Sequence, residues 1–357
     1  MTVPKPVVAQ LRVHDTGYPR NARIREHLEA TGFAVRVSLR RVDGPKALRL
    51  IADAVTMWRD TRSADAAVLS EFSLPFVPLA RLVTRLRGIP LIVDGFVRKY
   101  ETAIEDWGYA SARSPRARLL RTVDALSVRW ADLYLIDTEV RAEALRDRHG
   151  TATPVLGLPV GAPAWIRPRP PREPDGTLRM LYFGGNIPLH GLPFALEALE
   201  ATDPRITLEL VSYGPREPVR AVIERAGIAD RCLFHDTMSH RELLEHIYEA
   251  DVVLGIFGDS AKARSVVANK VWQGLAAGRI VVTRRTPAVE ELVPVAGDML
   301  QLVDDRAGLT AAYERLRAAP PRADPAVADR LESFVAQRFS ALTDWLSAAL
   351  ATPRTRR

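Results

Sequence analysis

Three basic side chains stand close together in one stretch of the sequence. Lys262 and Arg264 lie in a polar segment, and Lys270 follows near the start of a helical pattern whose apolar face begins with Val267. Cationic side chains beside a helix N-terminus suit a phosphate or a diphosphate, because the helix dipole adds positive charge at that end. Asn269 and Gln273 lie one turn apart on the same helix and offer amides that donate and accept hydrogen bonds. The stretch therefore predicts an anion-binding site, with a solvated helix face as the alternative.

Asp94 is the carboxylate whose position most needs an explanation. It falls at the carboxyl end of a buried apolar run, where an ionised carboxylate is costly unless it is used or paired. A functional role and an ion pair with Arg98 or Lys99 are both open interpretations.

Earlier in the chain, Gly17 permits a tight turn after the first apolar run, and Arg20 would lie at the mouth of the following helix. An ordinary turn with a solvated arginine is the alternative there.

The elements that would position these residues follow from the apolar pattern of the first half. Short apolar runs alternate with amphipathic stretches, which predicts a parallel, doubly wound α/β sheet. The expected strands are 7–13, 34–39, 66–69, 90–93, 133–136 and a short one near Val155, and the expected helices include 20–31, 46–59 and 115–130. Neither GxGxxG after the first strand nor GxxxxGK[ST] anywhere occurs, which disfavours a nicotinamide dehydrogenase and a P-loop nucleotidase.

A proline-rich stretch, 166–177, separates this half from a second alternating pattern, because repeated prolines exclude helix and central strand. The expected strands beyond it are 178–183, 206–211, 233–234, 252–257, 280–282 and 299–303, and the expected helices include 193–200, 307–318, 326–350 and one that Ser239 and Glu242 begin as a capping box. We therefore predict a first domain of residues 1–165, a linker of 166–177, a second domain of 178–325, and a last segment, 326–357, holding a final helix and a basic tail.

Composition narrows the class of protein. A chain of 357 residues fits two domains, and Cys232 is its only cysteine, which excludes disulfide frameworks and multi-cysteine metal sites. The net charge of +7 arises in residues 1–165, with 25 Lys and Arg against 18 Asp and Glu. This surplus suits an anionic acceptor or membrane surface, or is a solvated arginine-rich surface. Basic runs interleaved with aromatics do not occur, so nucleic acid is not an expected partner. No leader pattern or long apolar stretch occurs, which predicts a soluble, cytoplasmic protein.

The stretch that begins at the apolar run 252–257 resembles a known family. It is similar to the donor-binding region of retaining, GT-B-fold glycosyltransferases of family 4, in their bacterial group 1 branch. The similar positions are Gly255-Ile256-Phe257-Gly258, Lys262-Ala263, Asn269-Lys270, Leu275-Ala276 and Thr286-Pro287-Ala288. The resemblance implies two Rossmann-like doubly wound domains facing a cleft, with a final helix that crosses back to the first domain.

The resemblance also implies an activity and its residues. Such an enzyme moves a hexose from a nucleoside diphosphate sugar to an acceptor hydroxyl with retention of anomeric configuration, without a metal or other cofactor. The implied catalytic residues are Asp94, Lys262 and Lys270, with Asp94 placing or deprotonating the acceptor hydroxyl. The implied donor-binding residues are Gly184, Gly185, Asn186, His190, Tyr213, Gly214, Lys262, Arg264, Asn269, Lys270 and Gln273, and the implied acceptor-binding residues are Gly17, Arg20, Tyr100 and Glu101.

The sequence departs from the family pattern at several of these positions. Ser265 and Gln273 stand where the family usually has two glutamates, and Asn186 and His190 stand where it commonly has a basic pair. A non-catalytic nucleotide-sugar-binding scaffold is therefore an alternative, as is a GT-B epimerase or pseudo-glycosidic coupling enzyme. The base, sugar, linkage and oligomeric state stay open, and so does the acceptor, for which a lipid-linked saccharide, a polysaccharide precursor and a small natural product all fit. Peripheral membrane contact is compatible with the sequence.

Overall fold

The computed structural model describes residues 4–40, 45–150, 152–321 and 324–351. The chain forms two compact units, one from the described residues of Met1–Val160 and Val335–Arg357, the other from Gly161–Phe334. The proline-rich stretch lies within the second unit. The last helix, α13 (Val327–Ala351), is shared between the units. The basic tail expected at the C-terminus lies outside the described residues.

The first unit contains a parallel sheet of six strands in the order β2-β1-β3-β4-β5-β6. Its central strands are apolar and wholly buried, as expected of strands covered by helices on both faces. The strands are β1 (Val7–Val13), β2 (Ala34–Leu39), β3 (Ala66–Leu69), β4 (Leu91–Asp94), β5 (Leu133–Ile136) and β6 (Val155–Gly157). The predicted strands of the first half are confirmed, to within one residue at β4.

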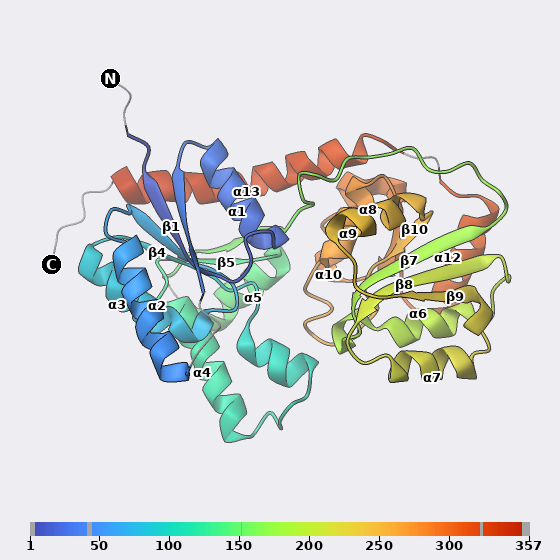
Figure 1. Ribbon diagram of the computed structural model, residues 1–357, viewed down its shortest axis with the longest axis horizontal. Coiled ribbons are helices and arrows are strands. Elements are labelled where there is room, and N and C mark those ends of the chain that lie inside the picture. The colour runs from blue at the N-terminus through green and yellow to red at the C-terminus, as the bar shows by residue number, and fades with distance from the viewer. Residues whose placement is uncertain (1–3, 41–44, 151, 322–323, 352–357) are drawn as a thin grey trace. The chain divides into compact units, whose positions relative to one another are not determined.

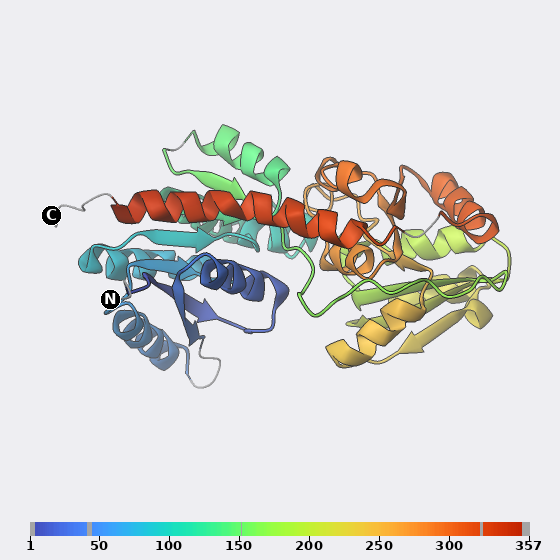
Figure 2. The same ribbon diagram turned by 90° about the horizontal axis from the view of Figure 1, so that it is seen from above.

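Helices connect these strands and cover the sheet. They are α1 (Pro19–Ala30), α2 (Lys46–Asp60), α3 (Val77–Arg87), α4 (Pro115–Arg129) and α5 (Glu139–His149), with a short turn η1 (Leu74–Phe76) and a π-helical turn η2 (Glu101–Asp106). Ser114 and Thr138 cap the N-termini of α4 and α5 with their side chains. Helix α2 lies beside α3 on one face of the sheet, and α1 lies beside the later part of α13 on the other (Figures 1 and 2). His27 Nε2 joins α1 to α13 through Thr343 Oγ1 at 2.7 Å.

The second unit contains another parallel sheet of six strands, in the order β12-β11-β10-β7-β8-β9. The strands are β7 (Leu178–Gly185), β8 (Ile206–Tyr213), β9 (Cys232–His235), β10 (Val252–Leu254), β11 (Ile280–Arg284) and β12 (Leu300–Val303). The helices are α6 (Leu192–Leu199), α7 (Glu217–Arg225), α8 (His240–Glu249), α9 (Asn269–Ala276), α10 (Pro287–Glu290), α11 (Val293–Ala296) and α12 (Arg306–Ala318), with short turns η3 (Pro188–His190), η4 (Ala229–Arg231) and η5 (Gly297–Met299). Helices α6 and α7 lie on one face, and α8 and α9 lie on the other (Figure 1).

Two predictions for the second unit need correction. The strand expected over 252–257 ends at Leu254, and the following residues form a loop. A Cβ on Gly255 would lie 2.5 Å from Thr283 Cβ, so the backbone there packs against a side chain of β11. The helical pattern expected to include Val267 begins only at Asn269. The predicted capping box of Ser239 and Glu242 is confirmed at the start of α8.

The strand orders locate the positions where each sheet can bind a ligand. In an open parallel sheet, ligands bind beyond the carboxyl ends of the strands, at the point where the direction of strand addition reverses. That point lies between β1 and β3 in the first unit and between β7 and β10 in the second. We call these two positions the first and second switch points. None of the described helices is long and apolar enough to cross a bilayer.

Candidate functional site

Two loops meet at the second switch point with their backbones in contact. The loop after β7 contains η3, and the loop after β10 leads to α9. Phe257 N–H donates to the carbonyl of His190 at 2.9 Å. A Cβ on Gly191 would lie 2.4 Å from Gly258 N, and a Cβ on Gly258 would lie 2.5 Å from Leu189 O. Glycine is required at both positions because any side chain would separate the two loops.

Lys270 is a buried cation at this switch point. Its residue is 3% exposed, and Nζ has no hydrogen-bond partner among the described residues. Nζ lies 3.8 Å from the ring centroid of Tyr182, and a Cβ on Gly184 would lie 3.6 Å from Nζ. Burial lowers the pKa of Lys270 well below its ordinary value, because a charged amine loses its hydration there. An anion bound beside Gly184 would supply the missing partner.

His190 lies in the same cluster and is neutral. Burial, followed by the charge of Lys270, lowers the pKa of His190 to about 2. Nδ1 lies 2.6 Å from the carbonyl oxygen of Gly185, which places the imidazole proton on Nδ1. Tyr182 Oη also donates to this carbonyl, at 2.7 Å. His190 therefore offers Nε2 as an acceptor for a hydroxyl group and does not offer a positive charge to a diphosphate.

The other basic residues predicted near this switch point differ in their surroundings. Lys262 is half-buried in the loop before α9, and its charge contributes to the low pKa of His190. Arg264, two residues on, is exposed. Asn269 is the first residue of α9, and Gln273 lies buried one turn later. The structure thus brings Lys262 and Lys270 together around His190, whereas Arg264 is open to solvent.

The residues predicted at the ends of β7 and β8 form a connected pair of turns. Asn186 N–H donates to Tyr213 O at 2.9 Å, and Asn186 Nδ2 donates to Pro215 O at 3.1 Å. The Tyr213 side chain is 60% exposed, and a Cβ on Gly185 would lie 3.0 Å from its ring. Gly214 follows with φ of 95°, a left-handed conformation that favours glycine. Asn186 therefore holds the loop after β8, and the Tyr213 ring is free to contact a ligand.

In the first unit, Asp94 is buried in an ion pair with Arg20. Both residues are 0% exposed. Arg20 Nε donates to Asp94 Oδ2 and Arg20 Nη2 donates to Oδ1, each at 3.0 Å. Arg20 also donates to the carbonyl oxygens of Leu158 and Ile136, so it joins the ends of three strands. Neither Arg98 nor Lys99, the partners considered from sequence, pairs with Asp94; the partner is Arg20. The acceptor roles predicted for Asp94 and Arg20 stay predictions, and in this structure both oxygens of Asp94 are already bonded.

Tyr100 and Glu101, predicted to bind the acceptor, also lie in an internal network. Tyr100 is buried, and its hydroxyl accepts from Arg121 Nη2 at 2.6 Å. Glu101 accepts from Arg98 Nη1 at 2.6 Å and from Arg141 Nη2. Burial alone would raise the pKa of Glu101, but the charges of Arg141 and Arg98 lower it to about 2. These contacts order the loop after β4.

Sequence reasoning missed a histidine and a glutamate at the first switch point. His14 follows β1, and Glu71 follows β3. His14 Nδ1 lies 3.1 Å from Glu71 Oε1, and Asn21 Nδ2 donates to the same oxygen at 2.8 Å. Glu71 is 0% exposed, and burial, then the charge of Asp94, raises its pKa. The buried carboxylate orients the imidazole and leaves Nε2 available at a half-exposed ring.

Aromatic rings surround His14. Its ring lies edge-on to Tyr18 at 5.5 Å and to Phe72 at 5.2 Å between centroids, and Phe96 lies 6.2 Å from Tyr18. Phe72 has φ of 62°, a left-handed conformation that is strained for a residue with a side chain. Gly17, in the same loop as His14, is exposed, and its N–H donates to Asp15 Oδ1 at 2.8 Å. The first switch point therefore presents an imidazole among apolar ring faces.

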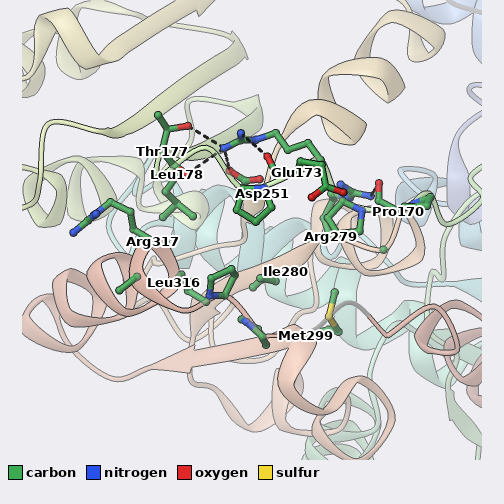
Figure 3. Close-up of a pocket in the computed structure, with 18 residues that line it drawn as sticks. Pro170, Glu173, Thr177, Leu178, Asp251, Arg279, Ile280, Met299, Leu316 and Arg317 are labelled. Atoms are coloured by element: carbon green, nitrogen blue, oxygen red, sulfur yellow. Dashed lines mark hydrogen bonds and ion pairs between the residues drawn. The ribbon is translucent and has the colours of Figure 1, made fainter.

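A cavity of ≈ 540 Å³ lies in the second unit at the opposite, amino edge of the sheet (Figure 3). Asp251, Arg172 and Arg279 of its lining make hydrogen bonds within the protein. Asp251 Oδ2 accepts from Arg172 Nη2 at 2.8 Å, and the same nitrogen donates to Thr177 Oγ1 at 2.9 Å. Arg279 donates to the carbonyl oxygens of Arg169 and Pro170. These contacts fasten the proline-rich stretch to the sheet.

Glycosyltransferases of known structure have the same architecture. The chain is similar to Anabaena HepE in complex with UDP, with a TM-score of 0.65 and 14% identity over 96% of this chain and 100% of that one. It is similar to sucrose-phosphate synthase from Thermosynechococcus elongatus, with a TM-score of 0.63 and 17% identity over 97% of each chain. It is also similar to WaaG, a glycosyltransferase involved in lipopolysaccharide biosynthesis, with a TM-score of 0.65 and 14% identity over 97% of this chain and 100% of that one. No protein-family model and no curated protein matches the sequence.

Proposed function

We propose, from the GT-B fold that these likenesses establish, that the chain transfers a sugar from a nucleoside diphosphate sugar to an acceptor hydroxyl. The observation that carries this proposal is Lys270, a buried amine without a hydrogen-bond partner at the second switch point. A cation in that position is unfavourable until an anion binds beside it. Complexes of a similar protein support the choice of anion, because HepE binds UDP, UDP together with glucose, and UDP-glucose.

In this proposal the second unit binds the donor. The diphosphate lies beside Gly184 and the N-terminus of α9, where Lys270 and Lys262 face it. Charge builds on the departing diphosphate as the glycosidic bond breaks, and a cation placed there beforehand stabilises the transition state more than the ground state. Neutral His190 accepts a hydrogen bond at Nε2 from a hydroxyl group of the donor. Gln273 and Tyr213 contact the nucleoside.

The first unit binds the acceptor. We assign the acceptor-side base to His14, because its Nε2 is available while both oxygens of Asp94 are bonded to Arg20. Glu71 holds the proton on Nδ1, so that Nε2 can accept a proton from the acceptor hydroxyl. Tyr18 and Phe72 offer apolar ring faces against which a sugar ring can pack. Retention of configuration, a hexosyl donor and metal independence are further parts of the proposal, supported by the family resemblance.

The test of the donor site is a nucleotide panel. We would measure calorimetric binding and thermal shift with UDP, GDP, dTDP and ADP, beginning with UDP because HepE binds it. The variant is Lys270→Ala, and the control is Arg241→Ala, which removes an exposed cation from α8 of the same unit. We expect one nucleotide to raise the melting temperature by mass action, and only Lys270→Ala to lose that effect. If no nucleotide binds, the donor assignment is wrong.

Turnover separates the enzyme from the scaffold alternative. Release of free nucleotide from the matching nucleotide sugar, measured with and without candidate saccharide acceptors, identifies a transferase. Binding without turnover would favour a non-catalytic scaffold, for which the substitutions Ser265 and Gln273 would then be the starting point.

An exposed apolar face in the first unit supports peripheral membrane contact. On α2, Leu48, Ile51 and Val55 are each about 60% exposed, and on α3, Leu82 and Leu86 are 56% and 66% exposed. Arginines accompany this face, including exposed Arg85 on α3, half-buried Arg49 on α2, and Arg87, whose guanidinium stacks on Trp58 at 3.6 Å. Apolar side chains flanked by arginines suit an anionic lipid surface. We therefore propose that the protein contacts an anionic membrane surface, and as further parts of the proposal that it does so in the cytoplasm and acts on a saccharide acceptor.

Vesicle sedimentation tests this contact. We expect the protein to sediment with vesicles of phosphatidylcholine and phosphatidylglycerol, but not with phosphatidylcholine alone, and to be released by salt. Ile51→Glu with Val55→Glu should abolish sedimentation. Leu119→Glu on α4, which changes a similarly exposed leucine elsewhere in the unit, should not. Equal sedimentation of both variants would refute the membrane assignment.

A further inference from the structure

A group of two histidines and one glutamate lies outside both switch points. Glu209 is on β8, His235 is the last residue of β9, and His246 is on α8. One potential ligand atom from each residue lies within 4.8 Å of the other two. His246 Nδ1 lies 2.8 Å and His235 Nε2 lies 3.5 Å from the same oxygen, Glu209 Oε2.

One ring nitrogen of the three side chains lacks a hydrogen-bond partner within the described part of the chain. Nε2 of His235 is buried and has no hydrogen-bond partner among the described residues, although it faces the carboxylate. Both imidazoles approach the same oxygen, Glu209 Oε2, and their ring centroids are 4.8 Å apart. The contact of His246 with that oxygen is a normal hydrogen bond, whereas 3.5 Å is too long for His235 to form one of similar strength. A cation between the three groups would give each of them a partner.

The spacing suits a tetrahedral metal ion. With metal–ligand distances of about 2.0–2.2 Å, two ligand atoms of a tetrahedron stand about 3.3–3.6 Å apart. The 3.5 Å between His235 Nε2 and Glu209 Oε2 already matches this value, and the shorter contact of His246 needs to open by less than an ångström. The ligand atoms of the two histidines lie within 4.8 Å of each other and would need to close by little more than an ångström at most. The three side chains are 26–37% exposed, so an ion can enter from solvent and water can take the fourth position.

We propose that Glu209, His235 and His246 bind one divalent transition-metal ion, with Zn²⁺ as the representative. Two imidazole ligands favour Zn²⁺, Ni²⁺, Co²⁺ or Cu²⁺ over Mg²⁺ and Ca²⁺, which prefer oxygen. The site shares no residue with the Lys270 cluster and takes no part in the proposed reaction. Its effect is structural: the ion links β9, the edge strand of the sheet, to β8 and α8, and therefore stabilises the second unit.

The experiment uses the untagged full-length protein, stripped with EDTA and dialysed. Zn²⁺ is titrated by calorimetry, and Co²⁺ is titrated by visible absorption, which reports nitrogen and oxygen ligation directly. We expect one equivalent of either ion to bind and Mg²⁺ not to compete. His235→Ala and His246→Ala should each weaken binding by about 10- to 100-fold or more. His240→Ala is the control, because His240 opens the same helix but packs on Trp165 at 5.9 Å between ring centroids.

A third variant separates ligation from folding. Glu209→Gln keeps a side chain that can hydrogen-bond His246 but removes the anionic ligand, so it should fold as the wild type and bind Zn²⁺ at least tenfold more weakly. Zn²⁺ should raise the melting temperature of the wild type but not of Glu209→Gln, and EDTA should reverse the rise. Absence of saturable binding at one equivalent, or equal Zn²⁺ affinity in the wild type and the three site variants, would overturn the proposal.

Discussion

The two switch points differ in how their charges are partnered. Beside the first, at the ends of β4 to β6, Arg20 and Asp94 are wholly buried and bonded to each other, and Glu101, in the turn after β4, lies between Arg98 and Arg141. At the second, Lys270 is equally buried but has no hydrogen-bond partner among the described residues. A buried charge with its partner inside the fold serves to hold strands together, whereas one without a partner is positioned for an external ligand.

His14 and Glu71 show a third arrangement. The glutamate is buried but the histidine is half-exposed, so the pair is partnered on one side and open on the other. Such a pair can pass a proton to or from a ligand, which the Arg20–Asp94 pair cannot do while both of its groups are bonded inside the fold. The comparison therefore predicts three different outcomes when the central residue of each arrangement is changed.

The largest effect is expected for His14→Ala. If His14 is the acceptor-side base, acceptor-dependent turnover of the nucleotide sugar that matches the binding panel should fall by about 10²–10⁴-fold, because that is the usual contribution of general-base catalysis. The affinity for the matching nucleotide should stay unchanged, since the proposed donor site lies in the second unit. Glu71→Gln should reduce turnover less, because the imidazole remains. Turnover within threefold of wild type in His14→Ala would return the role to Asp94 or to another group.

Asp94→Ala should act on stability. It leaves the guanidinium of Arg20 buried without its carboxylate, which typically costs about 3–5 kcal/mol. Urea denaturation, followed by fluorescence, measures the loss for the first unit. Glu197→Ala provides the contrast, because its partners Arg225 and Arg306 are exposed and such pairs contribute about 0–1 kcal/mol. Similar losses of unfolding free energy in both variants would contradict the distinction between a buried ion pair and an exposed one.

The sequence predicted the fold because burial leaves a clear pattern. Apolar runs such as Val252–Leu254 cannot be solvated, and their alternation with helices permits few arrangements other than a parallel sheet. The prediction of two doubly wound domains of the GT-B type is confirmed by the two sheets and by the similar structures. The predicted strand extended beyond the end of β10 because an apolar residue such as Phe257 can be buried in a loop as well as in a strand.

The sites were less predictable because their partners are distant in sequence. Lys270 was identified from its place at a helix start, but its burial without a partner depends on Tyr182 and Gly184 from another strand. Asp94 was identified as a costly carboxylate, yet its partner Arg20 is 74 residues away. Glu71 carried the same signal as Asp94, since it follows a buried apolar strand. The same reasoning, applied to every carboxylate that follows a predicted buried strand, identifies Glu71.

Lys270→Met should have opposite effects on binding and stability. If Lys270 contacts the diphosphate, loss of that charged contact should weaken binding of the matching nucleotide by about 10- to 100-fold, as expected for about 1.5–3 kcal/mol. The free protein should become more stable, because methionine fills the space without an unpaired buried amine. Calorimetry and thermal denaturation measure the two changes. A lower melting temperature in Lys270→Met would mean that Lys270 has a partner within the fold, as Arg20 does.

The smallest expected effects are two opposite trends with pH, one in folding stability and one in nucleotide affinity. In the free protein the pKa of Lys270 lies well below its ordinary value of 10.5, which the unfolded chain retains. Between these two pKa values the unfolded state binds more protons than the folded state, so folding stability rises with pH. A diphosphate bound beside Lys270 would raise the pKa of Lys270, so binding would take up a proton. The affinity for the matching nucleotide should then fall with rising pH through the window between the free and bound pKa values. The slope is at most about tenfold per pH unit.

Measurements above pH 7 keep the phosphate ionised, and subtracting the trends of Lys270→Met removes every other titrating group. If the wild type and Lys270→Met have parallel pH profiles, Lys270 stays charged without an anion, and the difference between the two switch points disappears.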